Sequence, residues 1–142
     1  MTSIVVDASV IVKWLFPHGG NDANTDKALR LFTEIEAERH AVRQPPHWLA
    51  EAAAVAVRID PSTAREKIAA FFDLQFATLA SVEVYSAACA LSSELGHHLF
   101  DTLYHAVALA DDCVLVTADE RYYQKAKRFG AIVLLADFDT SQ

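Results

Sequence analysis

The chain has 142 residues, of which 53% are apolar, and its formal net charge at pH 7 is −7. This length suits a single domain spanning residues 1–142 with its own hydrophobic core, and no window approaches the run of ~18 apolar residues that crosses a membrane. Taken alone, the acidic balance argues against a nucleic-acid binder, but if a metal ion engages four of the carboxylates the remaining charge of −3 decides little. A strand pattern begins almost at the first residue, so we expect no signal peptide and a cytoplasmic location.

Strand and helix patterns alternate along the chain, beginning with a β-branched run at residues 4–6 that ends on Asp7. Such a run is typical of a central, buried strand, and a helical pattern follows it over 10–16. Further helices are expected over 25–40, 47–59, 60–74, 82–95, 99–110 and 121–129, and further strands over 41–44, 76–80, 113–117 and 131–135. This alternation predicts an α/β fold with a parallel sheet.

Two groups of residues have simple structural interpretations. Cys89 and Cys113 fall in a helix and a strand pattern, so we expect small core residues rather than a disulfide. The basic residues Arg121, Lys125 and Arg128 recur at helical spacing. They form either a solvated face near a helix C-terminus or a stripe that contacts phosphate groups, and the sequence does not decide between the two.

Four carboxylates occupy comparable places relative to the expected sheet. Asp7 and Asp119 follow the two most apolar strands, and Glu51 and Asp101 come early in helices on the same side. Ligands of open parallel sheets bind beyond the carboxyl ends of the strands. Four such groups at one point would repel strongly, because one close pair costs ~4 kcal/mol at an effective dielectric constant of 20. A divalent cation would relieve this repulsion, and ligands that are all oxygens suit Mg²⁺ or Mn²⁺.

The segments IVVDAS, PPHWLAEAAAV, LFDTLYHAVALA and LVTADERYYQKAK occur in this order along the chain. In order and spacing they resemble a PIN domain, and most of all the small bacterial VapC-type toxin ribonucleases. The resemblance covers essentially the whole chain. It implies a three-layer α/β/α sandwich with a central parallel sheet, and a Mg²⁺- or Mn²⁺-dependent endoribonuclease that hydrolyses RNA.

The resemblance also implies roles for particular residues and partners. Asp7, Asp101 and Asp119 match acidic positions that would hold the metal, and Glu51 matches a further ligand or the group that orients the attacking water. In addition, Ser9 and Thr117 match small hydroxyl positions that would hydrogen-bond ligands or metal waters. Such toxins pair as homodimers and are silenced by a cognate antitoxin protein that fills the active-site groove.

Each acidic position also has a structural interpretation. Asp7 could cap the following helix, Glu51 could point to solvent, and Asp101 could be a first-turn acid favoured by the helix dipole. Asp119 could be an N-cap, and a capping box formed by Thr117 and Glu120 is a further alternative. Their joint occurrence is what favours a metal site over four separate structural roles.

Four other functions are alternatives, and the last two fit the sequence poorly. A housekeeping PIN nuclease, or a PIN fold kept as a binding module without turnover, would share the same acids. A signalling receiver domain also has an acidic Mg²⁺ pocket on an α/β sheet, but it needs adjacent acids after its first strand, where this chain has only Asp7. A phosphatase with an aspartyl nucleophile needs a second Asp two residues on, where Ser9 stands.

Several residues near these motifs are interpreted as structural. His97 and His98 are predicted to be an exposed loop pair, and His105 to be a helix histidine whose hydrogen bonds are met inside the protein. Asp111 and Asp112 precede a strand, so we expect them at the opposite edge of the sheet. Tyr104 and Trp14 are expected in the core rather than stacked on bases, and Thr63 with Glu66 fits a capping box.

Overall fold

The computed structural model describes residues 2–18 and 23–139. In this part of the chain five strands form one sheet in which all the paired strands are parallel, in the order β3-β2-β1-β4-β5. The strands are β1 (Thr2–Val6), β2 (His40–Gln44), β3 (Ala77–Thr78), β4 (Val114–Thr117) and β5 (Ile132–Leu134). The predicted strand at 76–80 is shorter than expected, and the other four lie where the sequence placed them to within two residues.

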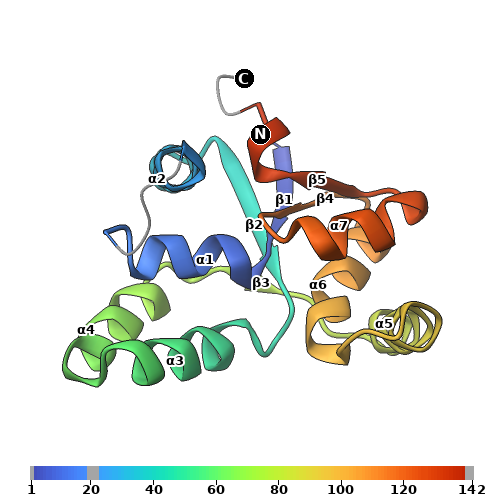
Figure 1. The fold of residues 1–142 in the computed structure, drawn as a ribbon, viewed down its shortest axis with the longest axis horizontal. Helices are drawn as coiled ribbons and strands as arrows, with labels where there is room; N and C mark the ends of the chain where they lie inside the picture. The colour runs from blue at the N-terminus through green and yellow to red at the C-terminus, as the bar shows by residue number, and fades with distance from the viewer. Residues whose placement is uncertain (1, 19–22, 140–142) are drawn as a thin grey trace.

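Helices cover both faces of this sheet, which confirms the three-layer α/β/α arrangement. Figure 1 shows α1 to α4 on one side of the sheet and α5 to α7 on the other. The helices are α1 (Ala8–Leu15), α2 (Ala23–Glu36), α3 (Trp48–Ile59), α4 (Pro61–Phe72), α5 (Val82–Leu95), α6 (Leu99–Ala110) and α7 (Glu120–Ala126), with short 3-10 helices at Lys127–Phe129 and Leu135–Asp137.

β1 is the central strand because its apolar residues are covered from both faces. Ile4, Val5 and Val6 are completely buried, as expected for a parallel strand between two helix layers. The strand order reverses at β1, since β2 and β3 lie to one side and β4 and β5 to the other. Receiver domains have the order 2-1-3-4-5, so the observed topology excludes that alternative.

The carboxyl end of β1 is fixed by a side chain of β2 that sequence reasoning did not single out. Gln44 is completely buried. Its Oε1 accepts a hydrogen bond from the Val6 backbone N–H at 2.8 Å, and its Nε2 donates to the Val6 carbonyl at 2.9 Å. The two bonds satisfy both polar groups of Val6, which would otherwise be costly to bury. They also hold the backbone next to Asp7 in place.

Side chains that accept hydrogen bonds from backbone N–H groups start four of the helices. Asp7, Asp60, Ser81 and Asp119 cap α1, α4, α5 and α7, respectively. The predicted capping box of Thr63 and Glu66 is wrong, because the N-cap of α4 is Asp60, whose side chain accepts from Ser62 N–H. Asp60 precedes a proline at the first helical position, which is favoured there.

Two further expectations differ from the structure. The helix expected over 25–40 ends at Glu36, because Glu38 takes a positive φ of 61° and turns the chain into β2. Cys89 was expected in the core, but it lies on the exposed face of α5. An alanine-rich helix with a weak apolar stripe does not reveal which small residues face inward.

Among the helices of the described residues, none has both the length and the apolar character needed to span a bilayer.

Candidate active site

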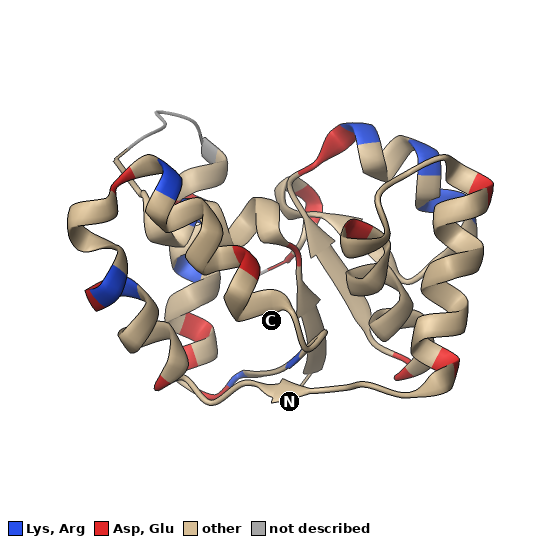
Figure 2. Ribbon diagram, turned by 90° about the horizontal axis from the view of Figure 1, so that it is seen from below, with Lys and Arg blue, Asp and Glu red and all other residues tan. Residues whose placement is uncertain are grey.

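The acidic residues gather where the strand order of the sheet reverses. Val6 of β1 pairs with Val116 of β4, and the Asp7 N–H donates to the Val116 carbonyl at 3.0 Å. Asp7 and Thr117 therefore leave the sheet side by side, at the reversal point where parallel α/β sheets bind ligands. Figure 2 shows acidic positions toward the middle of the molecule, between the helices of the two sides.

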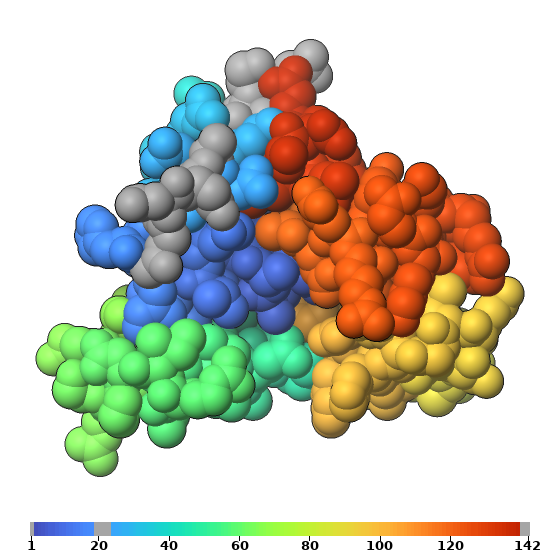
Figure 3. Space-filling view, viewed as in Figure 1, coloured from blue at the N-terminus to red at the C-terminus, as the bar shows by residue number. Residues whose placement is uncertain are grey.

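The surface is hollowed below this point. Figure 3 shows a notch between the part formed by α3 and α4 and the part formed by α5 and α6. In Figure 1 the N-terminal ends of α3 and α6 both lie beside this notch, below the start of α1. Glu51 and Asp101 belong to the first turns of α3 and α6. The notch thus brings the N-terminal turns of separate helices to one edge of the sheet.

One oxygen of the Asp7 carboxylate accepts three hydrogen bonds. Oδ2 accepts from the Ser9 backbone N–H at 3.2 Å, from Ser9 Oγ at 2.6 Å and from Thr117 Oγ1 at 3.1 Å. Burial raises the pKa of Asp7, these hydrogen bonds counteract part of the rise, and the negative charge of Asp101 adds to it. Asp7 is thus a helix cap, as the structural interpretation predicted, and also a carboxylate destabilised in its charged form.

The hydroxyls of Ser9 and Thr117 both lie within hydrogen-bonding distance of Asp7, and their oxygens also lie 3.3 Å apart. Each hydroxyl has a single hydrogen, and both hydrogens go to Asp7 Oδ2. The oxygens in turn accept backbone N–H groups, Ser9 Oγ from Ala118 at 2.9 Å and Thr117 Oγ1 from Asp119 at 3.1 Å. Ser9 and Thr117 therefore tie the start of α1 to the loop between β4 and α7.

Glu51 is half-buried rather than directed to solvent. Its Oε1 accepts a hydrogen bond from the hydroxyl of Tyr104 at 2.8 Å, and Tyr104 itself is completely buried, as expected for a core residue. Burial raises the pKa of Glu51, the Tyr104 hydroxyl lowers it in part, and the charges of Asp101 and Asp7 raise it further. These charge effects show that the three carboxylates lie within range of one another.

Beside Glu51, the His47 side chain connects α3 with α6. Its Nε2 donates to the carbonyl of Phe100 at 3.0 Å and lies 4.0 Å from Glu51 Oε2. The ring packs against Tyr104, with the two ring centres 5.1 Å apart. Burial lowers the pKa of His47, so the neutral ring with its hydrogen on Nε2 fits this position.

From the residues that the structure describes, Asp101 and Asp119 each accept one hydrogen bond. Asp101 Oδ2 lies 2.9 Å from His97 Nε2. Asp119 caps α7, with Oδ1 accepting from the Tyr122 N–H at 3.0 Å, so the N-cap is Asp119 rather than Thr117. The charges of Asp7, Asp101 and Asp119 all raise the pKa of the Tyr122 hydroxyl, although burial raises it more. The three acids therefore each lie within electrostatic range of the Tyr122 hydroxyl.

The four carboxylates share one property. Within the part of the chain that the structure describes, each uses a single oxygen for its hydrogen bonds and leaves the other without one. The bonded oxygens are Asp7 Oδ2, Glu51 Oε1, Asp101 Oδ2 and Asp119 Oδ1. Carboxylate ligands of metals are commonly held in this way by hydrogen bonds from the surrounding protein. The donor set is therefore suited to Mg²⁺ or Mn²⁺.

The structure brings the predicted acids to one edge of the sheet without closing them into a ligand shell. Among the described residues, no three His, Cys, Asp or Glu side chains are close enough together to hold a metal ion. Convergence of the four acids on one shared ion therefore stays a prediction from the sequence.

Other residues named from the sequence lie away from this edge or are structural. Asp111 forms an ion pair with Arg43 at 3.2 Å, near the start of β4 and so at the opposite edge, as predicted. His105 is completely buried between the Tyr122 hydroxyl and the Gly130 carbonyl, as predicted. His97 is the exception. The sequence placed it in an exposed loop, whereas only 15% of its side chain is exposed.

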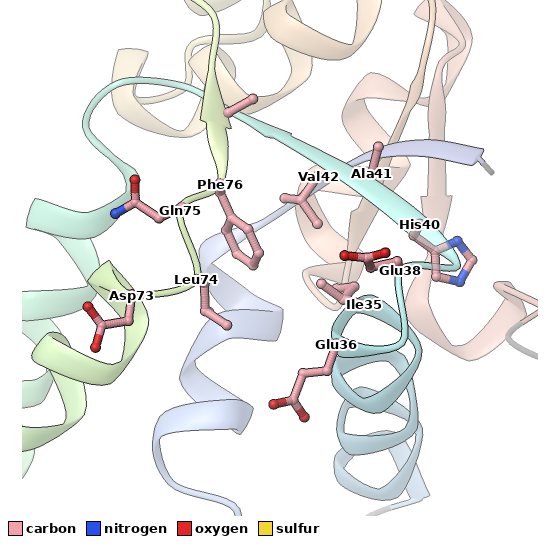
Figure 4. A pocket seen from close by; sticks show the side chains of 11 residues that line it. Ile35, Glu36, Glu38, His40, Ala41, Val42, Asp73, Leu74, Gln75 and Phe76 are labelled. Carbon is pink, nitrogen blue, oxygen red and sulfur yellow. The ribbon is translucent and has the colours of Figure 1, made fainter.

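A separate cavity of about 580 Å³ opens at the other end of the sheet. It is lined by the start of β2 and the segment before β3, and Figure 4 shows Leu74 and Phe76 projecting toward Val42 and Ile35. Its polar rim carries Glu36, Glu38 and Asp73 among others. Because it lies at the amino ends of β2 and β3, it is not continuous with the acidic edge described above.

Comparisons with known proteins agree with this fold. The profile of the PIN domain family matches residues 4–128. Two solved structures are similar, each with a TM-score of 0.64. The first is PAE2754 from Pyrobaculum aerophilum, which is 20% identical and is matched over 95% of this chain and 90% of that chain. The second is VapBC2 from Rickettsia felis bound to a DNA fragment from their promoter, which is 17% identical and is matched over 94% of this chain and 97% of that chain. A search of curated proteins found no match. The family match spans most of the chain, which therefore belongs to the PIN domain family.

Proposed function

We propose that this protein is a divalent-metal-dependent endoribonuclease that uses Mg²⁺ or Mn²⁺. PIN domains are in general nucleases, which supports the reaction class. The observation that carries the proposal is the shared property of the four acids. Asp7, Glu51, Asp101 and Asp119 each keep one oxygen free of hydrogen bonds from the described residues, at the reversal point of the sheet.

Each residue of the proposed site has a role that fits its surroundings. Asp7, Asp101 and Asp119 would hold the cation through their unbonded oxygens. When bound, the cation lowers the pKa of a water molecule and neutralises charge on the phosphate. Glu51 Oε2, which takes no part in the hydrogen bond from Tyr104, would be a further ligand or would orient the attacking water. Ser9 and Thr117 keep Asp7 fixed by donating to its other oxygen.

We further propose that the protein is the toxin of a type II toxin–antitoxin pair, with RNA as substrate, a cognate antitoxin as partner, a homodimeric state and a cytoplasmic location. The similarity to VapBC2 supports this role. Val57, Ile59 and Phe72 on α3 and α4 expose more than half of their surface, which supports a protein partner. A housekeeping nuclease or a non-catalytic binding module remains the alternative.

The decisive experiment compares the wild-type protein with Asp7→Asn and Asp101→Asn on structured RNA in Mg²⁺, Mn²⁺ or EDTA. We expect metal-dependent cleavage by the wild type and a loss of at least 100-fold in each variant, since each removes a charged ligand. Asp112→Asn is the matched control, because this exposed acid at the opposite edge carries the same charge. Cleavage in EDTA, or cleavage that survives both site substitutions, would show the proposed mechanism to be wrong.

The toxin role needs its own test. Induced expression of the wild type should arrest growth, expression of Asp7→Asn should not, and Asp112→Asn should behave as the wild type. A wild-type protein that cleaves RNA in vitro but leaves growth unchanged when expressed would favour the housekeeping nuclease. A wild type that binds RNA without cleaving it would favour the binding module.

A further inference from the structure

His97 occupies the short link between α5 and α6, and its backbone is held from both sides. α5 ends at Gly96, whose φ of +59° is the left-handed conformation that glycine adopts without strain. The His97 N–H then donates to the Ser92 carbonyl at 3.2 Å, and Ser92 Oγ donates to the His97 carbonyl at 2.5 Å. The position of the imidazole ring is therefore set by the end of α5.

The His97 ring contacts three side chains from two helices. Nε2 lies 2.9 Å from Asp101 Oδ2, Nδ1 lies 3.5 Å from Lys125 Nζ, and the ring packs against Tyr122 with 4.8 Å between ring centres. A lysine ammonium group can only donate a hydrogen bond, so Nδ1 is the acceptor. The hydrogen of the neutral ring is then on Nε2 and is donated to Asp101.

We infer that His97 is a positioning residue that holds Asp101 in the orientation the metal site requires. This inference rests on the proposed nuclease function. The side chain of Asp101 is 43% exposed, so without a partner it would sample several rotamers. The hydrogen bond from His97 occupies Oδ2 and leaves Oδ1 for a cation. Lys125 fixes which ring nitrogen carries the hydrogen, and Tyr122 fixes the plane of the ring.

The nearby ion pair between Arg128 and Glu94 is a useful contrast, because neither side chain contacts an acid of the proposed site. Arg128 contacts Glu94 at 3.1 Å, joining the segment after α7 to α5, but the two side chains are 62% and 57% exposed. Exposed pairs of this kind contribute little. His97 differs because it is mostly buried, is held on both sides of its ring and donates to an acid of the proposed site. Lys125, which the sequence placed in a basic stripe with Arg121 and Arg128, therefore contacts His97, and His97 in turn contacts Asp101.

The test measures Mn²⁺ binding directly, by calorimetry on metal-free protein without RNA. We expect His97→Ala to weaken Mn²⁺ binding at least tenfold, the usual effect of removing a hydrogen-bond partner of a metal ligand. His97→Gln should recover much of the loss, because its amide can donate to Asp101 and accept from Lys125. Arg128→Ala removes the exposed ion pair beside it and should bind Mn²⁺ as the wild type does. Thermal unfolding of each variant separates a change in binding from a loss of the fold.

Each outcome decides a distinct question. Equal Mn²⁺ affinity in the wild type and His97→Ala would overturn the positioning role while leaving the nuclease proposal intact. The positioning role is also overturned if His97→Ala loses binding and a folded His97→Gln loses as much. A folded wild type that binds no Mn²⁺ and cleaves no RNA would overturn the proposed function itself, and the inference with it. Long-range nitrogen-15 NMR of the wild type should show the hydrogen on Nε2, and a hydrogen on Nδ1 instead would also refute the inference.

Discussion

Replacing Asp7 by Asn should stabilise the metal-free protein, although Asp7 caps a helix. Burial and the charge of Asp101 raise the pKa of Asp7, which means that the folded state disfavours the charged carboxylate. The Asn carbonyl oxygen can take the place of Oδ2 and accept the same three hydrogen bonds from Ser9 and Thr117. Its NH₂ group takes the place of Oδ1, which accepts no hydrogen bond from the described residues.

The magnitude follows from two opposing effects. A like-charge pair separated by ~8 Å contributes roughly 2 kcal/mol at an effective dielectric constant of ~20, and Asp7 interacts with both Asp101 and Glu51. Hydrogen bonds to a neutral acceptor are weaker than those to a charged one, and this weakening lowers the stability of the variant by roughly 1–2 kcal/mol over the three bonds. We expect a net gain of about 2 kcal/mol in the free energy of unfolding, or a rise of ~5 °C in Tm.

Asp60→Asn is the matched control, and its effect on Tm should be opposite to that of Asp7→Asn. Asp60 also caps a helix and accepts from the N–H and hydroxyl of the second residue after it, at 3.2 and 2.6 Å. These are the same distances as at Asp7, but the hydrogen bonds of Ser62 and Thr63 lower the pKa of Asp60. Removing its charge should therefore lower Tm, while removing the charge of Asp7 raises it.

The assay is thermal unfolding in EDTA between pH 4 and pH 8. Because the folded pKa of Asp7 is raised, its favourable contribution is present below the unfolded value of 3.8 and is lost as pH rises through the folded pKa. The Tm advantage of Asp7→Asn should accordingly be small near pH 4 and grow toward neutral pH. If Asp7→Asn lowers Tm at pH 7, as Asp60→Asn should, the proposed destabilisation of the charged Asp7 is wrong.

Three further predictions concern single side chains. Gln44→Leu leaves the N–H and carbonyl of Val6 without the side-chain partners they have in the wild type, so the free energy of unfolding measured in urea should fall by about 2–4 kcal/mol. A fall below ~1 kcal/mol would mean that other contacts hold β1. Tyr104→Phe removes the donor that lowers the pKa of Glu51, so a carbon-13 NMR titration should show that pKa higher than in the wild type. Burial lowers the pKa of His105 in the folded state. The contribution of His105 to stability is therefore present above the unfolded value of 6.5 and is lost as pH falls through the folded pKa. We expect His105→Gln to be less stable than the wild type at pH 8, with a difference in Tm that narrows toward pH 5.

Local patterns predicted the elements of this fold well because neighbouring residues determine them. The expected helices at 82–95 and 99–110 match α5 and α6 at both ends, since Ser81 and Gly96 are strong start and stop signals for the first of them. The positions of Asp7 and Asp119 beyond adjacent strands also followed from the sequence, because β-branched runs identify the buried strands. The start of α4 was predicted to within one residue, but its cap was misassigned because Asp60 and Thr63 both have capping side chains.

Contacts between distant segments explain what the sequence could not provide. Gln44 acts on Val6 from 38 positions away, and no pattern near Gln44 distinguishes it from a surface glutamine. His97 lies 28 positions from Lys125, and the pair meets only because α5 and α7 lie on the same side of the sheet. The one available signal was local. His97 precedes Asp101 by four positions, a spacing that brings two side chains of a helix together.

Capping a helix and holding a metal ion are compatible roles for a carboxylate, because a cap needs only one of its two oxygens. Asp60 uses both, since Oδ1 accepts from Ser62 and Oδ2 accepts from Thr63, and it lies partly exposed at the start of α4. Asp7 uses only Oδ2 among the described residues, and its pKa is raised rather than lowered. The local Asp-x-Ser motif does not separate these two aspartates, because each stands two positions before a serine at a helix start. The unbonded oxygen, together with the cost of ionising Asp7 at this edge, is what distinguishes a carboxylate available to a cation from one that only starts a helix.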